Sequence, residues 1–242
     1  MPILVISDIH ANLNALESVL QDAGTVDQVF CLGDLVGYGP DPNECVQLIR
    51  SLPNLVCLMG NHDAAILGLI DSSAFNSDAR ASLLWLDTVL SEENRQYLGQ
   101  LDEMWSDTCV TLAHGSPRNP IWEYVLDSRT ARGNFNYFST PHCLIGHSHL
   151  PVLYFIDPED NSLHLDIPAD RQPVQLPPRA LLNPGSVGQP RDHDPRASYA
   201  LLDIEQNTWE IRRTPYDIAA VQQRIQKAGL PLRHALRLAE GI

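Results

Sequence analysis

Apolar residues in the first part of the chain form three short runs that alternate with segments of helical periodicity. The runs cover residues 3–6, 28–32 and 55–59, and apart from Gln28 each has the length and continuous apolar character of a buried strand. Amphipathic segments at 14–20 and 44–52 lie between them. Because parallel strands need crossover connections, which helices usually provide, this alternation predicts β-α units and a largely parallel sheet.

The remainder of the chain predicts helices first and antiparallel strands afterwards. A helical pattern with Ser77 and Ser91 as N-caps is followed by two apolar strands, a helix between them, and two hairpins with polar turns. A proline-rich segment is the best candidate for a mobile loop. In chain order the expected features are helices at 64–101, a strand at 109–113, a helix at 127–138, a strand at 143–145, a hairpin of 151–156 with 163–167, the loop at 168–178, a hairpin of 198–204 with 208–213, and a helix at 215–228.

A parallel first half and an antiparallel second half favour an α/β fold in which two sheets pack face to face with helices outside. The chain has 242 residues, of which 44% are apolar, and this is enough for one compact domain with a substantial core. We therefore expect a single domain over residues 1–242 with a helical insertion at about 64–104.

The charge balance narrows the possible partners. The chain has 30 acidic and 16 basic residues, a formal net charge of −14, so long nucleic acids and anionic membrane surfaces should repel it. There is no run of the roughly 20 apolar residues that a membrane helix needs, and the N-terminus lacks the layout of a secretory signal. We expect a cytoplasmic protein. Four of its five cysteines lie in apolar strand-like runs and are expected to be buried and reduced, namely Cys31, Cys57, Cys109 and Cys143.

Side chains that can bind metal follow five of the predicted strands. Any one of these short motifs is as well explained by a turn or a solvated loop. Their coincidence at successive strand ends favours a common site, because ligands bind at the carboxyl edge of an α/β sheet. The residues are, strand by strand, Asp8 and His10; Asp34; Asn61 and His62; His114; and His147 and His149.

The number of potential ligands indicates two metal ions. Without His62 there are seven, which exceeds the three or four protein ligands of a catalytic zinc site. Seven ligands with one shared carboxylate fit a binuclear centre. The mixture of imidazole and oxygen donors favours divalent transition metals, with manganese the first choice and iron, zinc, cobalt or nickel as alternatives.

The same motifs, in the same order, resemble the calcineurin-like metallophosphoesterases, in particular their bacterial small-molecule and diadenosine tetraphosphatase-like branch. Asp-X-His, Gly-Asp, Gly-Asn-His-Asp, His-Gly and Gly-His-X-His span Asp8 to His149, and residues 183–186 resemble a later family segment. The resemblance implies a four-layer α/β/β/α sandwich of two mixed sheets. It also implies one metal on Asp8, His10, Asp34 and His149, a second on Asp34, Asn61, His114 and His147, a bridging role for Asp34, and His62 as the acid beside the leaving group.

One motif departs from the protein phosphatases of this superfamily. Where they carry an aspartate that orients the catalytic histidine and an arginine that clamps phosphate, this chain has Gly37 and Tyr38. A dedicated phosphoprotein phosphatase is therefore disfavoured. Asp41 or Asp63 could orient His62 instead, although either could equally cap a loop.

Substrate binding is expected from arginines on loops near the metal ligands. Arg118, Arg191 and Arg196 are the candidates, since a guanidinium binds two phosphate oxygens at once. An ordinary surface ion pair is an equally good interpretation of each, above all of Arg191 with Asp192 beside it. The aromatic loop at 120–124 could stack on a base or sugar, but packing against the core is the slightly favoured reading.

These features predict a metal-dependent phosphoesterase that hydrolyses a small phosphomonoester or phosphodiester, with a nucleotide a plausible substrate. The expected reaction is in-line attack by a metal-bridging hydroxide, without a covalent enzyme intermediate. Three alternatives remain: a protein Ser/Thr phosphatase, a diadenosine polyphosphate hydrolase, and a non-catalytic scaffold. Retention of His62 beside a full ligand set argues against the scaffold, which needs no proton donor. The sequence leaves the oligomeric state and the substrate open.

Overall fold

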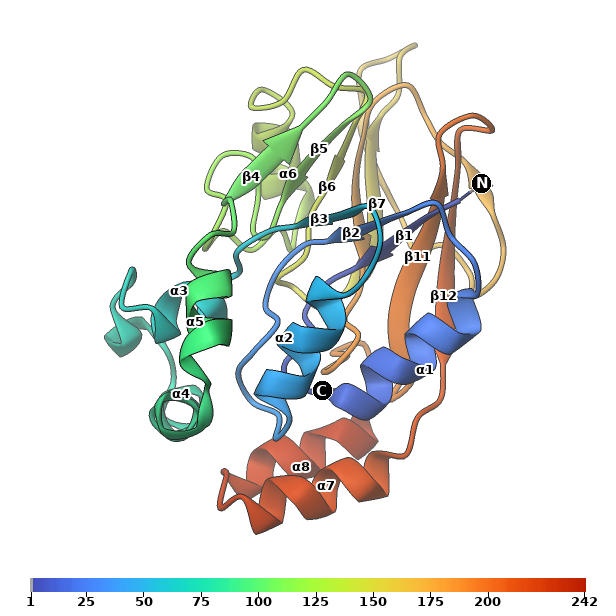
Figure 1. Ribbon diagram of the computed structural model, residues 1–242. Coiled ribbons are helices and arrows are strands. Elements are labelled where there is room, and N and C mark those ends of the chain that lie inside the picture. The colour runs from blue at the N-terminus through green and yellow to red at the C-terminus, as the bar shows by residue number, and fades with distance from the viewer. Residues whose placement is uncertain (1) are drawn as a thin grey trace.

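The structure is a computed structural model that describes residues 2–242, and its strands form two mixed six-stranded sheets. The first sheet contains, in spatial order, β3 (Leu55–Cys57), β2 (Gln28–Cys31), β1 (Ile3–Ile6), β11 (Ala197–Asp203), β12 (Thr208–Thr214) and β9 (Val174–Gln175). The second contains β4 (Met104–Ser106), β5 (Val110–Ala113), β6 (His142–Leu144), β10 (Ala180–Pro184), β7 (Pro151–Ile156) and β8 (Leu163–Asp166). Helices pack on the outer faces (Figure 1), which confirms the expected α/β/β/α sandwich.

The helices fall into three groups. Two of them, α1 (Leu13–Ala23) and α2 (Pro42–Arg50), cover the first sheet, and α6 (Ser128–Asn134) covers the second. Between β3 and β4 the chain forms α3 (Asn61–Ile66), a 3-10 turn (Ser72–Ala74), α4 (Ser77–Val89) and α5 (Glu92–Leu98). The C-terminal pair α7 (Ile218–Lys227) and α8 (Leu232–Glu240) lies side by side beneath α1 and α2 (Figure 1).

The alternating direction of side chains along each strand explains why an apolar core lies on both faces of the first sheet. Ile3 and Val5 of β1 belong to the apolar core between the two sheets, whereas Leu4 and Ile6 belong to the core under the helices of the first sheet. Successive side chains of a strand point to opposite faces, so a strand that is covered on both faces must be apolar throughout. This is why β1 reads as an uninterrupted apolar run.

The predicted pairings of the main strands are confirmed. The strands β1, β2 and β3 are parallel, and both predicted hairpins form, β7 with β8 and β11 with β12. The sequence analysis missed β4, β9, β10 and α8. A strand of two or three residues carries too little periodicity to detect, and β9 pairs with β12 inside the segment 168–178 that was expected to be a mobile loop.

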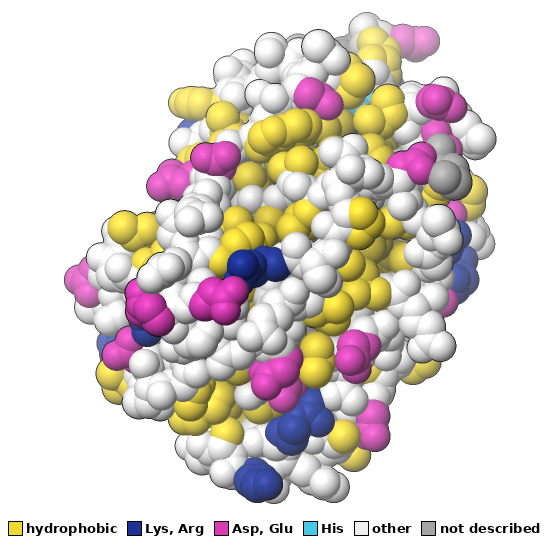
Figure 2. Space-filling model, viewed as in Figure 1, with side chains coloured by type: hydrophobic (Ala, Val, Ile, Leu, Met, Phe, Trp, Pro, Cys, Tyr) yellow, Lys and Arg dark blue, Asp and Glu magenta, His cyan; other side chains and the backbone are white. Residues whose placement is uncertain are grey.

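The prediction of buried, reduced cysteines is met in part, and the acidic side chains can be located on the surface. Acidic side chains are scattered over the face shown in Figure 2 and do not gather in one patch. All five cysteines are free; Cys31 and Cys143 are buried as expected, but Cys57 and Cys109 are partly exposed because they lie near the edges of their sheets. Among residues 2–242, the helices are too short or too polar to cross a membrane.

Candidate functional site

The structure brings all seven predicted ligands together, at the ends of strands from both sheets. Asp8 and His10 follow β1, Asp34 follows β2, and Asn61 begins α3 just after β3. The second sheet provides the remaining ligands after β5 and β6, namely His114, His147 and His149. Every one of the seven side chains is buried. The side chains that the sequence analysis grouped at successive strand ends thus lie together in the fold.

Three of these residues form a first cluster near Asp34. His149 Nε2 lies 3.3 Å from Asp8 Oδ1 and 3.2 Å from His10 Nε2. The Nε2 atom of His10 is in turn 3.6 Å from Asp34 Oδ2. Ring nitrogens and carboxylate oxygens thus converge on one small volume, an arrangement that could hold a metal ion.

A second cluster lies on the other side of the same aspartate. His114 Nε2 is 3.5 Å from Asp34 Oδ2, 3.2 Å from Asn61 Oδ1 and 3.2 Å from His147 Nδ1. Asp34, His114 and His147 form another group that could hold a metal ion. A single carboxylate oxygen, Asp34 Oδ2, therefore faces both clusters.

The histidines are oriented from behind by backbone carbonyl groups. In three of them the Nδ1 atom donates to a carbonyl oxygen, so that Nε2 points into the site. The pairs are His10 with Val36 at 3.2 Å, His114 with Leu32 at 3.0 Å, and His149 with Gln189 at 2.6 Å. Such a partner fixes both the tautomer and the ring plane, which a preorganised ligand set requires.

Backbone strain is concentrated at the same positions. Asp8, His10, Asp34, His147 and His149 all have φ between 49° and 63°, in the left-handed region that non-glycine residues rarely adopt. Each such residue costs on the order of 1–3 kcal/mol unless its surroundings impose the conformation. Strain at five of seven candidate ligands is the pattern expected of a functional site. There the unusual backbone conformation directs side chains to positions that a regular helix or strand could not provide.

The segment 183–186 supports both halves of the site. Asn183 Nδ2 donates to the Gly146 carbonyl oxygen at 2.8 Å and to Ser148 Oγ at 3.0 Å, and so ties down the loop that carries His147. Ser186 Oγ donates to the Asp8 carbonyl oxygen at 2.8 Å. Its resemblance to a family segment is thus matched by contacts with two ligand loops.

Burial sets the protonation of the cluster. It raises the pKa of Asp8 to about 7 and, with Asp63 as the next cause, raises the pKa of Asp34 well above its ordinary value. The pKa values of His10, His147 and His149 are lowered well below the ordinary value by the same desolvation. Asp8 Oδ1 is buried without a hydrogen-bond partner among residues 2–242. A group of carboxylates and neutral imidazoles held together in this way fits a divalent cation, which would neutralise the buried charge.

His62 lies against this centre in a tight aromatic pocket. Its backbone N–H donates to Asp34 Oδ1 at 2.9 Å, and its ring centroid is 5.0 Å from that of His10 and 4.4 Å from that of Tyr38. Burial lowers the pKa of His62 well below its ordinary value. Within the described chain, its buried Nδ1 atom has no hydrogen-bond partner.

Neither aspartate that was considered as a partner of His62 acts as one. Asp63 accepts from the backbone N–H groups of Gly60, Leu35 and Val36 at 3.0–3.2 Å. Asp41 is paired with Arg224. Both carboxylates therefore serve the alternative role, that of holding loops and a helix in place, and the orientation of His62 comes from packing.

Gly37 leaves the space that the His62 ring occupies. A Cβ atom at this position would lie 2.4 Å from His62 Nδ1, and the residue has φ +91°. Gly37→Ala is expected to lower the free energy of unfolding by more than the roughly 1–2 kcal/mol of a left-handed alanine alone, as measured in urea. Gly24→Ala is the matched control, because Gly24 has φ +68° and nothing within 4 Å of its Cβ position. Equal losses in the two variants would show that the ring does not depend on Gly37.

The three candidate arginines differ in their surroundings. Arg118 is paired with Glu123, and Arg196 with both Asp194 and Asp170. These two guanidinium groups are occupied by carboxylates, and neither lines the cavity beside the metal-ligand clusters. Arg191 does line that cavity, which has a volume of about 260 Å³. The neighbouring carboxylate of Asp192 pairs with Arg213. The surface ion pair between Arg191 and Asp192 that the sequence analysis considered is therefore not formed.

Residues of the aromatic loop 120–124 differ in their surroundings: one lines the cavity and another packs against the core. The Tyr124 ring stacks on the His147 ring at a centroid distance of 3.8 Å and lines the same cavity. Trp122 packs against Phe75 at 5.0 Å and belongs to the core. The sequence analysis did not assign the remaining walls, which come from Tyr38, from residues 76–78 at the start of α4 and from α8. The spacing of Arg233 and Arg237, one helical turn apart between Pro231 and Gly241, was a signal that could have revealed α8.

Comparison with known proteins is consistent with this geometry. Residues 1–207 match the family model described as calcineurin-like phosphoesterase superfamily domain. An uncharacterized protein of Methanocaldococcus jannaschii is 40% identical over 95% of this chain and 93% of its own length. The crystal structure of a metallophosphoesterase from Sphaerobacter thermophilus is 45% identical and has a TM-score of 0.91, covering 100% of this chain and 99% of that one. The symmetrical bis(5′-nucleosyl)-tetraphosphatase of Erwinia tasmaniensis is 33% identical over 54% of this chain and 50% of that enzyme, so this match spans about half of the relative.

Proposed function

Since the chain belongs to the calcineurin-like phosphoesterase superfamily, we propose that it is a metal-dependent hydrolase of a small phosphomonoester or phosphodiester, with nucleotides among the candidate substrates. The observation that carries the proposal is the position of Asp34 Oδ2, which lies 3.6 Å from His10 Nε2 on one side and 3.5 Å from His114 Nε2 on the other. A carboxylate shared by two buried ligand clusters is what a binuclear centre needs.

The donors fit two divalent transition-metal ions, one in each cluster. Bound ions supply Lewis acidity, which orients phosphoryl oxygens, lowers the pKa of a water molecule and offsets charge in the transition state. We assign Asp34 to both ions. One ion would also be held by Asp8, His10 and His149, and the other by Asn61, His114 and His147.

The protein's own groups would position the ester and protonate the leaving oxygen. His62 lies beside both clusters and is neutral in the absence of an anion, because burial lowers its pKa. A phosphate dianion next to the ring favours the cationic form, so substrate and proton would enter the site together. His62 could then deliver its proton to the departing alkoxide. Arg191, on the cavity wall, would bind the phosphoryl oxygens.

A panel of four substrates tests the proposed function. Purified protein with Mn²⁺ is assayed on a phosphomonoester, a phosphodiester, a dinucleoside tetraphosphate and a phosphopeptide. We expect turnover of one of the small esters to exceed that of the phosphopeptide. Preference for the phosphopeptide would support a protein phosphatase, and preference for the tetraphosphate would support the activity named for the Erwinia relative. No turnover of any substrate with Mn²⁺, Fe²⁺, Zn²⁺, Co²⁺ or Ni²⁺ would contradict the proposal and favour a scaffold.

Metal affinity should depend on pH with a definite sign. Burial raises the pKa of Asp8 to about 7, and a carboxyl group must lose its proton before it binds a metal. Protons therefore compete below pH 7, and the association constant for Mn²⁺ is expected to rise at least about tenfold from pH 6 to pH 8, since Asp34, whose pKa is also raised, must lose its proton as well. Titration calorimetry in buffers of different ionisation enthalpy would measure both the affinity and the released proton. An affinity that is the same at pH 6 and pH 8 would contradict the assignment of Asp8.

A further inference from the structure

A cavity of about 260 Å³ lies directly beside the two ligand clusters. Tyr38 and Tyr124 form the wall that it shares with the site: the Tyr38 ring is 4.7 Å from the His10 ring, and the Tyr124 ring is stacked on His147. A phosphoester whose scissile group is bound at the clusters would therefore extend its remaining part past these two rings. The volume is small for a ligand pocket, and it suits a compact group better than a peptide.

The other walls of the cavity are rich in positive charge. Arg191 lies on one side, and α8 contributes Arg233 and Arg237, which are four residues apart and so lie on the same face of the helix. The only carboxylate on the described walls is that of Asp78, which is 3.9 Å from Arg233. Three guanidinium groups and one carboxylate in a chain of net charge −14 make this cavity a local exception to the charge of the protein.

The arginines are incompletely neutralised by the protein. Arg191 Nη2 donates to Gln189 Oε1 at 2.9 Å, while its buried Nε atom has no partner within residues 2–242. Arg237 Nε donates to the carbonyl oxygen of Ile242. Burial, and next the positive charge of Arg191, lower the pKa of Arg237 to about 10. Cations held close together in this way are stabilised by an anion that binds between them.

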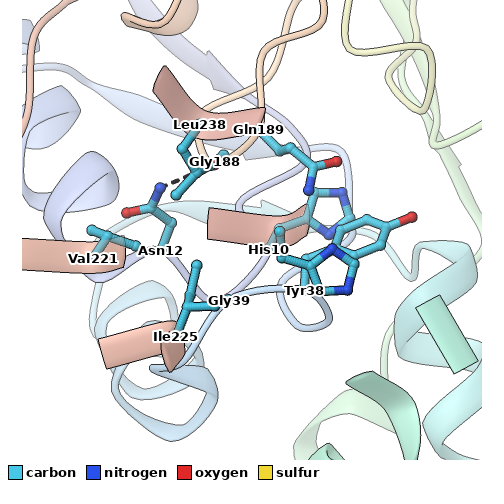
Figure 3. Close-up of a pocket in the computed structure, with 10 residues that line it drawn as sticks. His10, Asn12, Tyr38, Gly39, Gly188, Gln189, Val221, Ile225 and Leu238 are labelled. Atoms are coloured by element: carbon cyan, nitrogen blue, oxygen red, sulfur yellow. Dashed lines mark hydrogen bonds between the residues drawn. The ribbon is translucent and has the colours of Figure 1, made fainter. Parts of the chain in front are cut away.

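Packing holds α8 in a fixed position relative to the metal-ligand loops. Ala235 and Leu238 belong to the apolar cluster formed with α7, and His234 Nε2 donates to the Asp78 carbonyl oxygen at 3.1 Å. Figure 3 shows the narrow pocket beneath the site, where Leu238 and residues of α7 lie across from His10 and Tyr38. The backbone positions that carry Arg233 and Arg237 are thus fixed relative to the site, which lowers part of the entropic cost of binding an anion.

We propose that this cavity binds a second phosphate group of the substrate, so that the preferred substrate is a phosphoester that carries another phosphate beyond the scissile one. The inference rests on the proposed function and deepens it. Arg233 and Arg237 lie beyond residues 1–207, the part of the chain that matches the family model, so this preference would be a property of the C-terminal helices and not of the shared metal centre.

Alkanediol phosphates provide a direct test. For chains of two, three and four carbons, kcat/KM is measured for the bisphosphate and for the matching monophosphate of the same diol, with Mn²⁺-loaded protein. A second charge-assisted contact is expected to raise kcat/KM at least about tenfold for one or more chain lengths, mainly through KM. The double variant Arg233→Ala/Arg237→Ala should reduce this bisphosphate-to-monophosphate ratio to about two, the value that two equivalent esters give by statistics alone.

A matched control separates this effect from general electrostatics. Lys227→Ala removes a positive charge from an exposed position on α7 that does not line the cavity, and it should leave the ratio unchanged. Thermal unfolding of each variant checks that the fold is retained. A ratio near two in the wild-type protein, or a high ratio that persists in the double variant, would overturn the inference.

A binding measurement distinguishes failure of the inference from failure of the proposed function. If the wild-type protein hydrolyses neither diol phosphate, the proposed function fails, and titration calorimetry with the same compounds still decides the inference. The bisphosphate should then bind at least about tenfold more tightly than the monophosphate, and the double variant should lose this difference. Equal affinities in the wild-type protein would show that the cavity does not bind a second phosphate.

Discussion

Asp34→Asn is expected to remove both metal ions and, with them, nearly all hydrolysis. Asparagine keeps the shape of the side chain but lacks the charge that faces both clusters, where Oδ2 lies within 3.6 Å of two histidine Nε2 atoms. A neutral amide binds a transition metal far more weakly than a carboxylate. Elemental analysis should show a fall from two ions per chain to fewer than one, and turnover should drop by at least about a hundredfold because the metal-dependent chemistry is lost.

The stability of the metal-free protein should change in the opposite direction. The pKa of Asp34 is raised above its unfolded value of 3.8, chiefly by burial. Its contribution to stability is therefore present below about pH 4 and is lost as the pH rises through the folded pKa. At pH 8, far above the unfolded value, this stabilising contribution is reduced or lost, so Asp34→Asn in EDTA should melt at the same temperature as the wild-type protein or higher.

An exposed aspartate supplies the control for this prediction. Asp166→Asn makes the same chemical change on the exposed edge strand β8, and it should leave metal content and turnover as they are. Two metal ions per chain in Asp34→Asn would contradict a bridging role. Loss of only one ion would mean that the carboxylate serves one cluster.

The sequence predicted the central part of the fold because that part is governed by burial. A strand covered on both faces is apolar along its buried length, so β1 is a continuous apolar run and β2 is apolar after Gln28. The short strand β9 has two residues and owes its place to pairing with β12, a tertiary contact that no local pattern records. The helix α8 also went unpredicted, although the spacing of Arg233 and Arg237 between Pro231 and Gly241 is a helical signal.

The residues of the candidate site also differ in how far the sequence indicates them. The seven candidate ligands could be grouped from the sequence because each follows a strand, and the topology of parallel strands brings those ends to one edge. The roles of the arginines could not be sorted from the sequence, because a carboxylate stands near each of them in the chain and only the fold decides which pairs form. Arg196 is neutralised by Asp170, 26 residues away, whereas Arg191 is spared because Asp192 pairs with Arg213. Tyr38 was noted only as a departure from a phosphatase motif, and its contact with His62 emerges from the folded loop.

His62→Ala is expected to keep both metal ions and lose most of its turnover of unactivated esters. The backbone N–H of residue 62, which donates to Asp34 Oδ1 at 2.9 Å, remains in the variant, so the bridging carboxylate should stay in place. General acid catalysis typically contributes about 10²–10⁴-fold, and an alkyl phosphate should lose about that factor in kcat. The kcat for a p-nitrophenyl ester should fall much less, because its leaving group departs without a proton.

The comparison between the two esters distinguishes an acid from a metal ligand or a structural residue at position 62. His62 also lies in a group with His10 and Asp34 that could hold a metal ion, so metal content must be measured beside the rates. His164→Ala, at an exposed position on β8, serves as the control. It should change neither the metal content nor the turnover of either ester. A fall in bound metal with equal losses on both esters would make His62 a ligand. Unchanged turnover of the alkyl ester would show that protonation of the leaving group comes from elsewhere, and the acid assignment would fall.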